Sequence, residues 1–159
     1  MFLIGLALAA IQAPALPSIV AADCLDPARR DTILASDQQM AEFQRGIETY
    51  NQQWQARLDE RMNALGLSAE TKGKLAMQAM NAPAFAKASQ DNLENLKGMM
   101  TELQAVAQGT DKTAACQHIA RMTAYFPPMI ANALIQWQLI DAQIDGAEQA
   151  AAPAAPVTP

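Results

Sequence analysis

Between residues 40 and 65, eight large apolar side chains recur at intervals of three or four residues. They are Met40, Phe43, Ile47, Tyr50, Trp54, Leu58, Met62 and Leu65. Because successive residues of an α-helix are turned by about 100°, this spacing places all eight on one face of a single long helix. Burial of each side chain is worth roughly 1.5 to 3 kcal/mol, so this face must pack against other parts of the chain. Gly66 follows directly and is a natural helix stop.

The remainder of the chain beyond residue 22 also has helical spacing, and no run alternates apolar and polar residues as a strand would. Asp26 is a suitable N-cap for a short helix that begins at Pro27 and runs to about Leu34. Further helices are predicted over residues 68–81, 85–108, 111–126 and 129–144. In the helix over 85–108 we expect a buried stripe of Leu93, Leu96, Met99, Met100, Leu103 and Val106.

These helices predict an all-α protein. Short connections between amphipathic helices favour antiparallel neighbours. We therefore expect a small antiparallel helical bundle of four to five helices over residues 23–145, which is the size of one domain. Residues 146–159 are rich in Ala and Pro, and we expect them to form a flexible tail because proline breaks helices and small side chains cannot build a core.

The first 22 residues carry no charged side chain. They contain an apolar run from Phe2 to Ile11, a stretch interrupted by Pro14 and Pro17, and a small-residue ending at Ala22. This pattern is typical of a signal peptide, which we expect to be cleaved after Ala22. The alternative is an uncleaved membrane anchor, against which the two prolines count. The sequence thus predicts a periplasmic or secreted protein.

Two cysteines, Cys24 and Cys116, remain after such a cleavage. An exported protein enters an oxidising compartment, so we expect the two to form a disulfide. Two buried thiols are the alternative.

The net charge and the motifs of the sequence disfavour several classes of function. With 11 Lys and Arg against 16 Asp and Glu, the net charge of -5 disfavours binding to nucleic acid. No catalytic motif or phosphate-binding loop is present in the sequence, so we expect neither enzymatic activity nor a cofactor. Thioether and imidazole ligands for copper or haem are conceivable, although we expect the methionines to fill the core. These side chains are Met77, Met80, Met99, Met100, His118 and Met122.

The most unusual segment is the uncharged stretch over residues 122–140. Its apolar side chains point to nearly opposite sides of one helix, so a single bundle interface would not cover them all. We expect either that this helix is central in the bundle or that part of it binds a partner. The candidate partner-binding residues are Met129, Ile130, Leu134, Ile135, Trp137 and Leu139.

Two functions follow from these observations. The first is an exported, non-enzymatic envelope protein that binds a protein partner or an apolar surface, as a chaperone, adaptor or secretion-system accessory does. Its partner would be another envelope protein or a second copy, with peripheral membrane contact as a further option. The alternative function is a small periplasmic carrier of copper or haem that uses Met and His ligands.

Overall fold

The computed structural model describes residues 11–17, 19–36 and 38–151 of the chain. All regular secondary structure within these residues is helical, which confirms the predicted all-α bundle. None of the helices in this described part is long and apolar enough to cross a membrane. One 3-10 helix and six α-helices follow one another as η1 (Ala21–Leu25), α1 (Pro27–Ala35), α2 (Gln38–Ala64), α3 (Ala69–Met80), α4 (Pro83–Gln108), α5 (Lys112–Thr123) and α6 (Phe126–Ala151).

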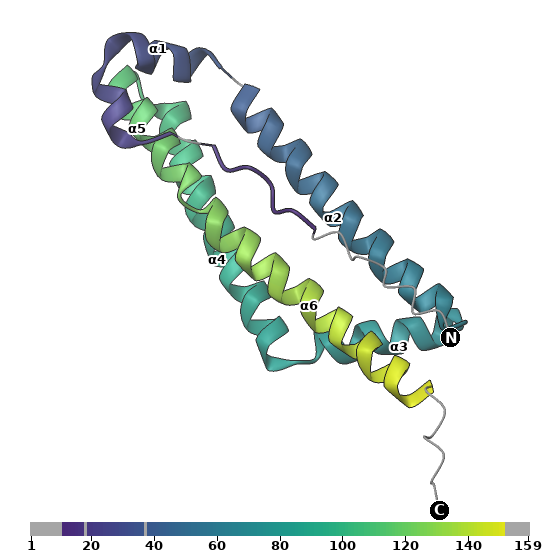
Figure 1. The fold of residues 1–159 in the computed structure, drawn as a ribbon. Coiled ribbons are helices and arrows are strands. Elements are labelled where there is room, and N and C mark those ends of the chain that lie inside the picture. The colour runs from purple at the N-terminus through teal and green to yellow at the C-terminus, as the bar shows by residue number, and fades with distance from the viewer. Residues whose placement is uncertain (1–10, 18, 37, 152–159) are drawn as a thin grey trace, which may run out of the picture.

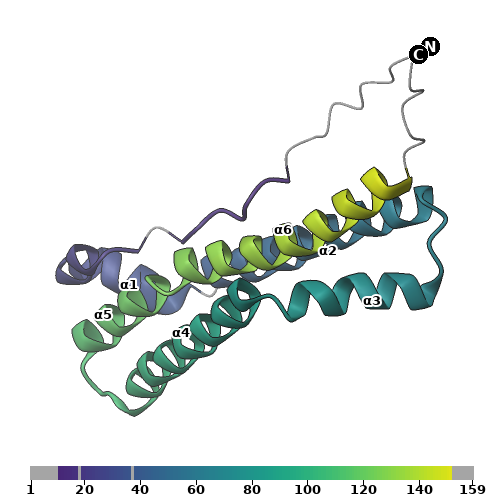
Figure 2. The same cartoon turned by 90° about the horizontal axis from the view of Figure 1, so that it is seen from below.

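The helices form three long rods (Figure 1). One rod is α2, the second is α3 followed after a clear bend by α4, and the third is α5 followed by α6 (Figure 2). The second rod runs antiparallel to the third, so that α4 packs on α5 and α6 while α3 packs on α6. The first rod, α2, runs in the same direction as α6, and η1 and α1 cover α5 at one end. The helix α6 is therefore in contact with α2, α3 and α4.

Most helix ends are where the capping residues predict them. The side chains of Asp26, Ser68 and Asp111 accept hydrogen bonds from the first-turn amides of α1, α3 and α5. Gly66, which ends the turn after α2, has a positive φ of 64°, a conformation that costs glycine little. Pro83 begins α4 at a position where its missing N–H is not needed.

The predicted apolar face of α2 is confirmed. Its four buried large side chains are Phe43, Tyr50, Trp54 and Leu58, and the other four are half-buried. The face where α2 meets α6, which we call the α2–α6 seam, is lined by two stacked aromatic pairs. The rings of Phe43 and Phe126 are 4.1 Å apart, and those of Trp54 and Trp137 are 6.4 Å apart. Such pairs stabilise a contact by about 0.5 to 1.5 kcal/mol each beyond the area they bury.

At its far end the α2–α6 seam is polar. Arg61 of α2 pairs with Asp141, Asp145 and Glu148, which lie on one side of α6. The hydrogen bond to Glu148 and the other two carboxylates raise the pKa of Arg61. Because three carboxylates at helical spacing would repel one another, the Arg61 guanidinium is what allows α6 to run past Asp141 beside α2.

The ion pairs of Arg61 help to explain why α6 is longer than the sequence predicts. We expected the last helix to span residues 129–144, but α6 begins at Phe126, with Pro127 and Pro128 in its first turn, and continues to Ala151. Residues 146–151, predicted as the start of the tail, are therefore helical. Proline is tolerated in a first turn, and Glu148 is held by Arg61. The rest of the predicted tail, residues 152–159, lies outside the described residues.

The orientation of α4 differs from the prediction. Of the expected buried stripe only Met99 and Val106 are half-buried, and the other four side chains are exposed. The side of α4 that faces α6 is instead centred on the buried Ala88. Small side chains let two helices approach closely, and polar side chains beside Ala88 bind across the contact. Asn132 donates to Asn92, and Gln136 donates to Ser89.

The predicted disulfide between Cys24 and Cys116 is present, with both cysteines fully buried. It joins η1 to α5, two elements that are 92 residues apart in the sequence. Hydrogen bonds from Arg30 to Thr113 and from Lys112 to Asp31 connect α1 to the same helix. The N-terminal helices are therefore held to the bundle covalently and by polar contacts.

We predict that replacing both Cys24 and Cys116 by Ser lowers the free energy of unfolding by about 4 kcal/mol, because the bond closes a loop of roughly 90 residues. The melting temperature, measured by circular dichroism, should fall by about 10 °C or more. Reductant should lower the melting temperature of the wild-type protein and leave that of the double variant unchanged. Equal melting temperatures for the two proteins would contradict this assignment of stability to the bond.

Candidate binding surface

The six partner-binding candidates on α6 are mostly enclosed by the bundle. Ile130 is buried beside Phe43 and Phe126, and Met129, Leu134, Trp137 and Leu139 are half-buried. Only Ile135 is exposed, at 40% of its surface. The indole N–H of Trp137 donates to Asn51 of α2, which further engages this side of the helix. A central position in the bundle, the alternative to a partner surface, thus describes most of this set.

The largest group of exposed apolar side chains on one helix face lies on α4 instead. It consists of Leu93, Leu96, Met100 and Leu103, which we call the α4 stripe. Each is between 41% and 53% exposed. The side chains follow one another at intervals of three, four and three residues, which is the heptad spacing of a coiled-coil contact. Ala107 continues this spacing at one end, whereas Ser89, which has the corresponding position at the other end, is hydrogen-bonded to Gln136 of α6.

The α4 stripe borders the core without belonging to it. Met99, which precedes Met100 directly, packs against the cluster of Phe43, Phe126 and Ile130. Adjacent residues on a helix point about 100° apart, so the neighbouring side chain of Met100 faces outward. The stripe was not identified as a surface from the sequence, because its large side chains have the spacing expected of a core.

Charged side chains of both signs lie along the same part of α4, but three of the four point away from the α4 stripe. Lys87 and Asp91 form an ion pair one helical turn apart, and the hydrogen bond to Asp91 raises the pKa of Lys87. Glu94 and Lys97 lie farther along the helix and are exposed. Of these four residues Lys97 borders the α4 stripe, so the apolar side chains dominate the chemistry of this surface.

The candidate metal ligands are distributed over three helices. Met77 and Met80 of α3 are 63% and 56% exposed, which corrects the expectation that they fill the core. Met99 is packed inward, whereas Met100 faces outward. In the part of the chain that the structure describes, no group of three or more His, Cys, Asp and Glu side chains is arranged to hold a metal ion.

His118 takes part in a polar cluster instead. Its Nδ1 atom is 2.7 Å from Glu102 Oε2 of α4, and Arg121 Nε donates to the same carboxylate oxygen at 3.1 Å. The hydrogen bond from His118 and the guanidinium of Arg121 lower the pKa of Glu102. This cluster connects α4 to α5, and Glu102 is half-buried within it.

We predict that Glu102→Gln destabilises the protein by about 0.5 to 1 kcal/mol at pH 6, the range for partly exposed ion pairs. Because the folded-state pKa of Glu102 is depressed, its contribution is present above its ordinary pKa near 4.5 and is lost as the pH falls through the lower folded value. Urea unfolding should therefore show a larger difference between variant and wild type at pH 6 than at pH 3. An equal difference at both values would refute an ionic role.

Comparison with known proteins adds no relative. No protein-family model, curated protein or solved structure matches this chain. The function of this protein is therefore inferred from the surfaces described above.

Proposed function

We propose that this protein is an exported, non-enzymatic helical protein of the cell envelope that binds a partner protein through the α4 stripe. The partner segment that fits best is an amphipathic α-helix. The proposal retains the function expected from the sequence and moves its contact surface from α6 to α4.

Export is supported by two features. The uncharged segment before Asp23 has the composition of a signal peptide, and Ala22 is a suitable cleavage position. The disulfide between Cys24 and Cys116 is a bond of oxidising compartments, and it is retained when residues 1–22 are removed. We infer a periplasmic or secreted location from these features together.

The single observation that carries the binding proposal is the heptad spacing of the exposed α4 stripe. Four large apolar side chains on one helix are costly to leave in water, at roughly 25 cal/mol for each Å² of apolar surface. A flat apolar surface would not require intervals of three and four residues, but a second helix does, because its side chains insert between those of the first. Ala107 at one end would let the partner helix approach closely.

A photo-crosslinking side chain at the exposed Gln104, one helical turn after Met100, tests this proposal in the native envelope. We predict an adduct whose partner peptide has apolar residues at intervals of three and four. Replacing Leu96 and Met100 by Gln should reduce this adduct about tenfold or more. The melting temperature should change by no more than about 2 °C, since both side chains are at the surface.

The matched control replaces Met77 and Met80 by Gln, because this apolar pair is at least as exposed but lies on α3. The control should keep the full adduct. The proposal is wrong if the adduct survives the Leu96 and Met100 substitutions, or if the variant unfolds, which would place the α4 stripe in a core.

A further inference from the structure

The segment of residues 11–17 lies against α2 in an extended, non-helical form (Figure 1). Ile11, Pro14 and Pro17 are half-buried, whereas the two residues between each of them are exposed. A period of three is that of the polyproline II helix, in which every third side chain lies on one edge. The segment therefore contacts α2 through one edge that ends in two prolines.

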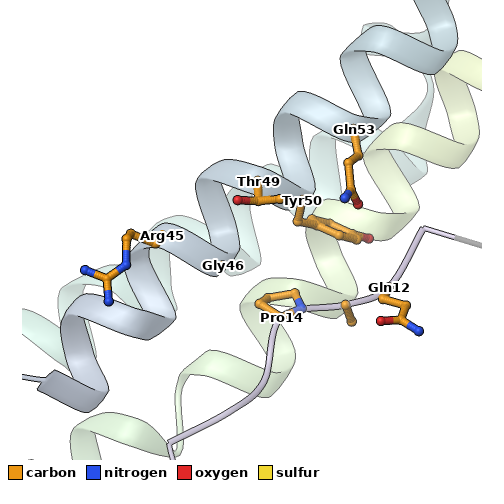
Figure 3. Close-up of a pocket in the computed structure, with 8 residues that line it drawn as sticks. Gln12, Pro14, Arg45, Gly46, Thr49, Tyr50 and Gln53 are labelled. Carbon is orange, nitrogen blue, oxygen red and sulfur yellow. The ribbon is translucent and has the colours of Figure 1, made fainter.

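Gly46 is the contact point on α2. A Cβ atom at this position would lie 2.9 Å from Cβ of Pro14, so the absence of a side chain makes room for the proline ring. Figure 3 shows Pro14 beside Gly46, with the ring of Tyr50 adjoining. The hollow along this contact, about 300 Å³, lies between residues 12–14 on one side and Arg45, Thr49 and Gln53 of α2 on the other. A second hollow continues past Pro17 to Phe43. Bare backbone beside an aromatic ring is a surface that suits proline.

Removal of residues 1–22, which belongs to the proposed function, would uncover this face of α2. The same chain contains a second segment of matching sequence. Residues 13–17 read Ala-Pro-Ala-Leu-Pro, and residues 152–156 read Ala-Pro-Ala-Ala-Pro. Pro153, Pro156 and Pro159 are again spaced by three. Residues 152–159 thus contain prolines at the spacing by which residues 11–17 contact α2.

The C-terminal segment cannot reach this face within its own chain. Glu148 is beside Arg61, and Gly46 lies about four helical turns before Arg61, which is roughly 22 Å. The five residues that follow Ala151 span at most about 18 Å when fully extended. Pro153 and Pro156 therefore fall short of the places held by Pro14 and Pro17. A second copy of the chain has no such restriction.

We propose that the face of α2 around Gly46 is a binding site for an extended proline-containing segment, and that residues 152–159 of a second copy occupy it after residues 1–22 are removed. Residues 11–17 hold the site in the unprocessed chain. The inference rests on the processing step of the proposed function, but it does not involve the α4 stripe.

The test uses protein recovered from an exporting host, and a labelled synthetic peptide of residues 149–159 is titrated into it by fluorescence anisotropy. We expect saturable binding. Gly46→Ala should weaken it about tenfold or more, because the new Cβ fills the space of the proline ring. The same substitution should raise the melting temperature, since alanine favours a helix interior over glycine by about 1 kcal/mol. Loss of binding would thus not come from unfolding.

Gly73→Ala is the matched control, because Gly73 is also inside a helix and a Cβ there would meet nothing within 4 Å. It should bind the peptide as wild type does. A peptide with Ser at positions 153 and 156 should bind about tenfold more weakly. Absence of binding to wild type, or equal binding by Gly46→Ala, overturns the proposed site.

Sedimentation of the recovered protein tests the second copy. Self-association should weaken on deletion of residues 152–159 and equally in Gly46→Ala, and an unchanged mass in the deletion variant would refute the exchange between copies.

Intact mass shows separately whether residues 1–22 are removed. If residues 1–22 are retained, the proposed processing is wrong. The titration is then made on the full chain with Pro14→Asp and Pro17→Asp. These two substitutions should release residues 11–17 from the face of α2 around Gly46. Binding there upholds the site, and its absence overturns it.

Discussion

The α2–α6 seam is the contact on which the arrangement of the bundle depends. Among the helices described, α6 is the main neighbour of α2, and residues 11–17 lie on the adjoining face of α2 around Gly46. Two aromatic stacks and the Arg61 cluster keep corresponding residues of the two helices side by side from Phe43 to Arg61. With one side of α6 committed to α2, the rod of α3 and α4 must pack on another side. The opposite flank of α4 remains in water.

Much of this fold is predictable from the sequence because the signals are local. The spacing of large side chains from Met40 to Leu65 has one interpretation, and side-chain caps such as Asp26 and Asp111 determine where helices begin. The pairing of Cys24 with Cys116 followed from there being two cysteines in an exported chain. These elements needed no knowledge of what each helix packs against.

The rotation of α4 could not be predicted in this way. Its strongest apolar pattern, Leu93 to Leu103, faces outward, while the contact with α6 is formed by Ala88 and by amide pairs such as Asn92 with Asn132. A helix that binds a neighbour through small and polar side chains gives no amphipathic signal for that side. The same limit applies to Gly46, since the role of a missing side chain is visible only beside the proline it accommodates. Neither proposed surface could therefore be predicted from the spacing of apolar residues in the sequence.

The central claim is that α4 turns Met99 into the bundle and Met100 into solvent. Oxidation by dilute hydrogen peroxide, followed residue by residue with mass spectrometry, tests this directly because the two methionines are adjacent in sequence. We predict that Met100 oxidises about as fast as the exposed Met77, and that Met99 oxidises at least tenfold more slowly. Equal rates for Met99 and Met100, or faster oxidation of Met99, would contradict the orientation of α4 and the binding surface derived from it.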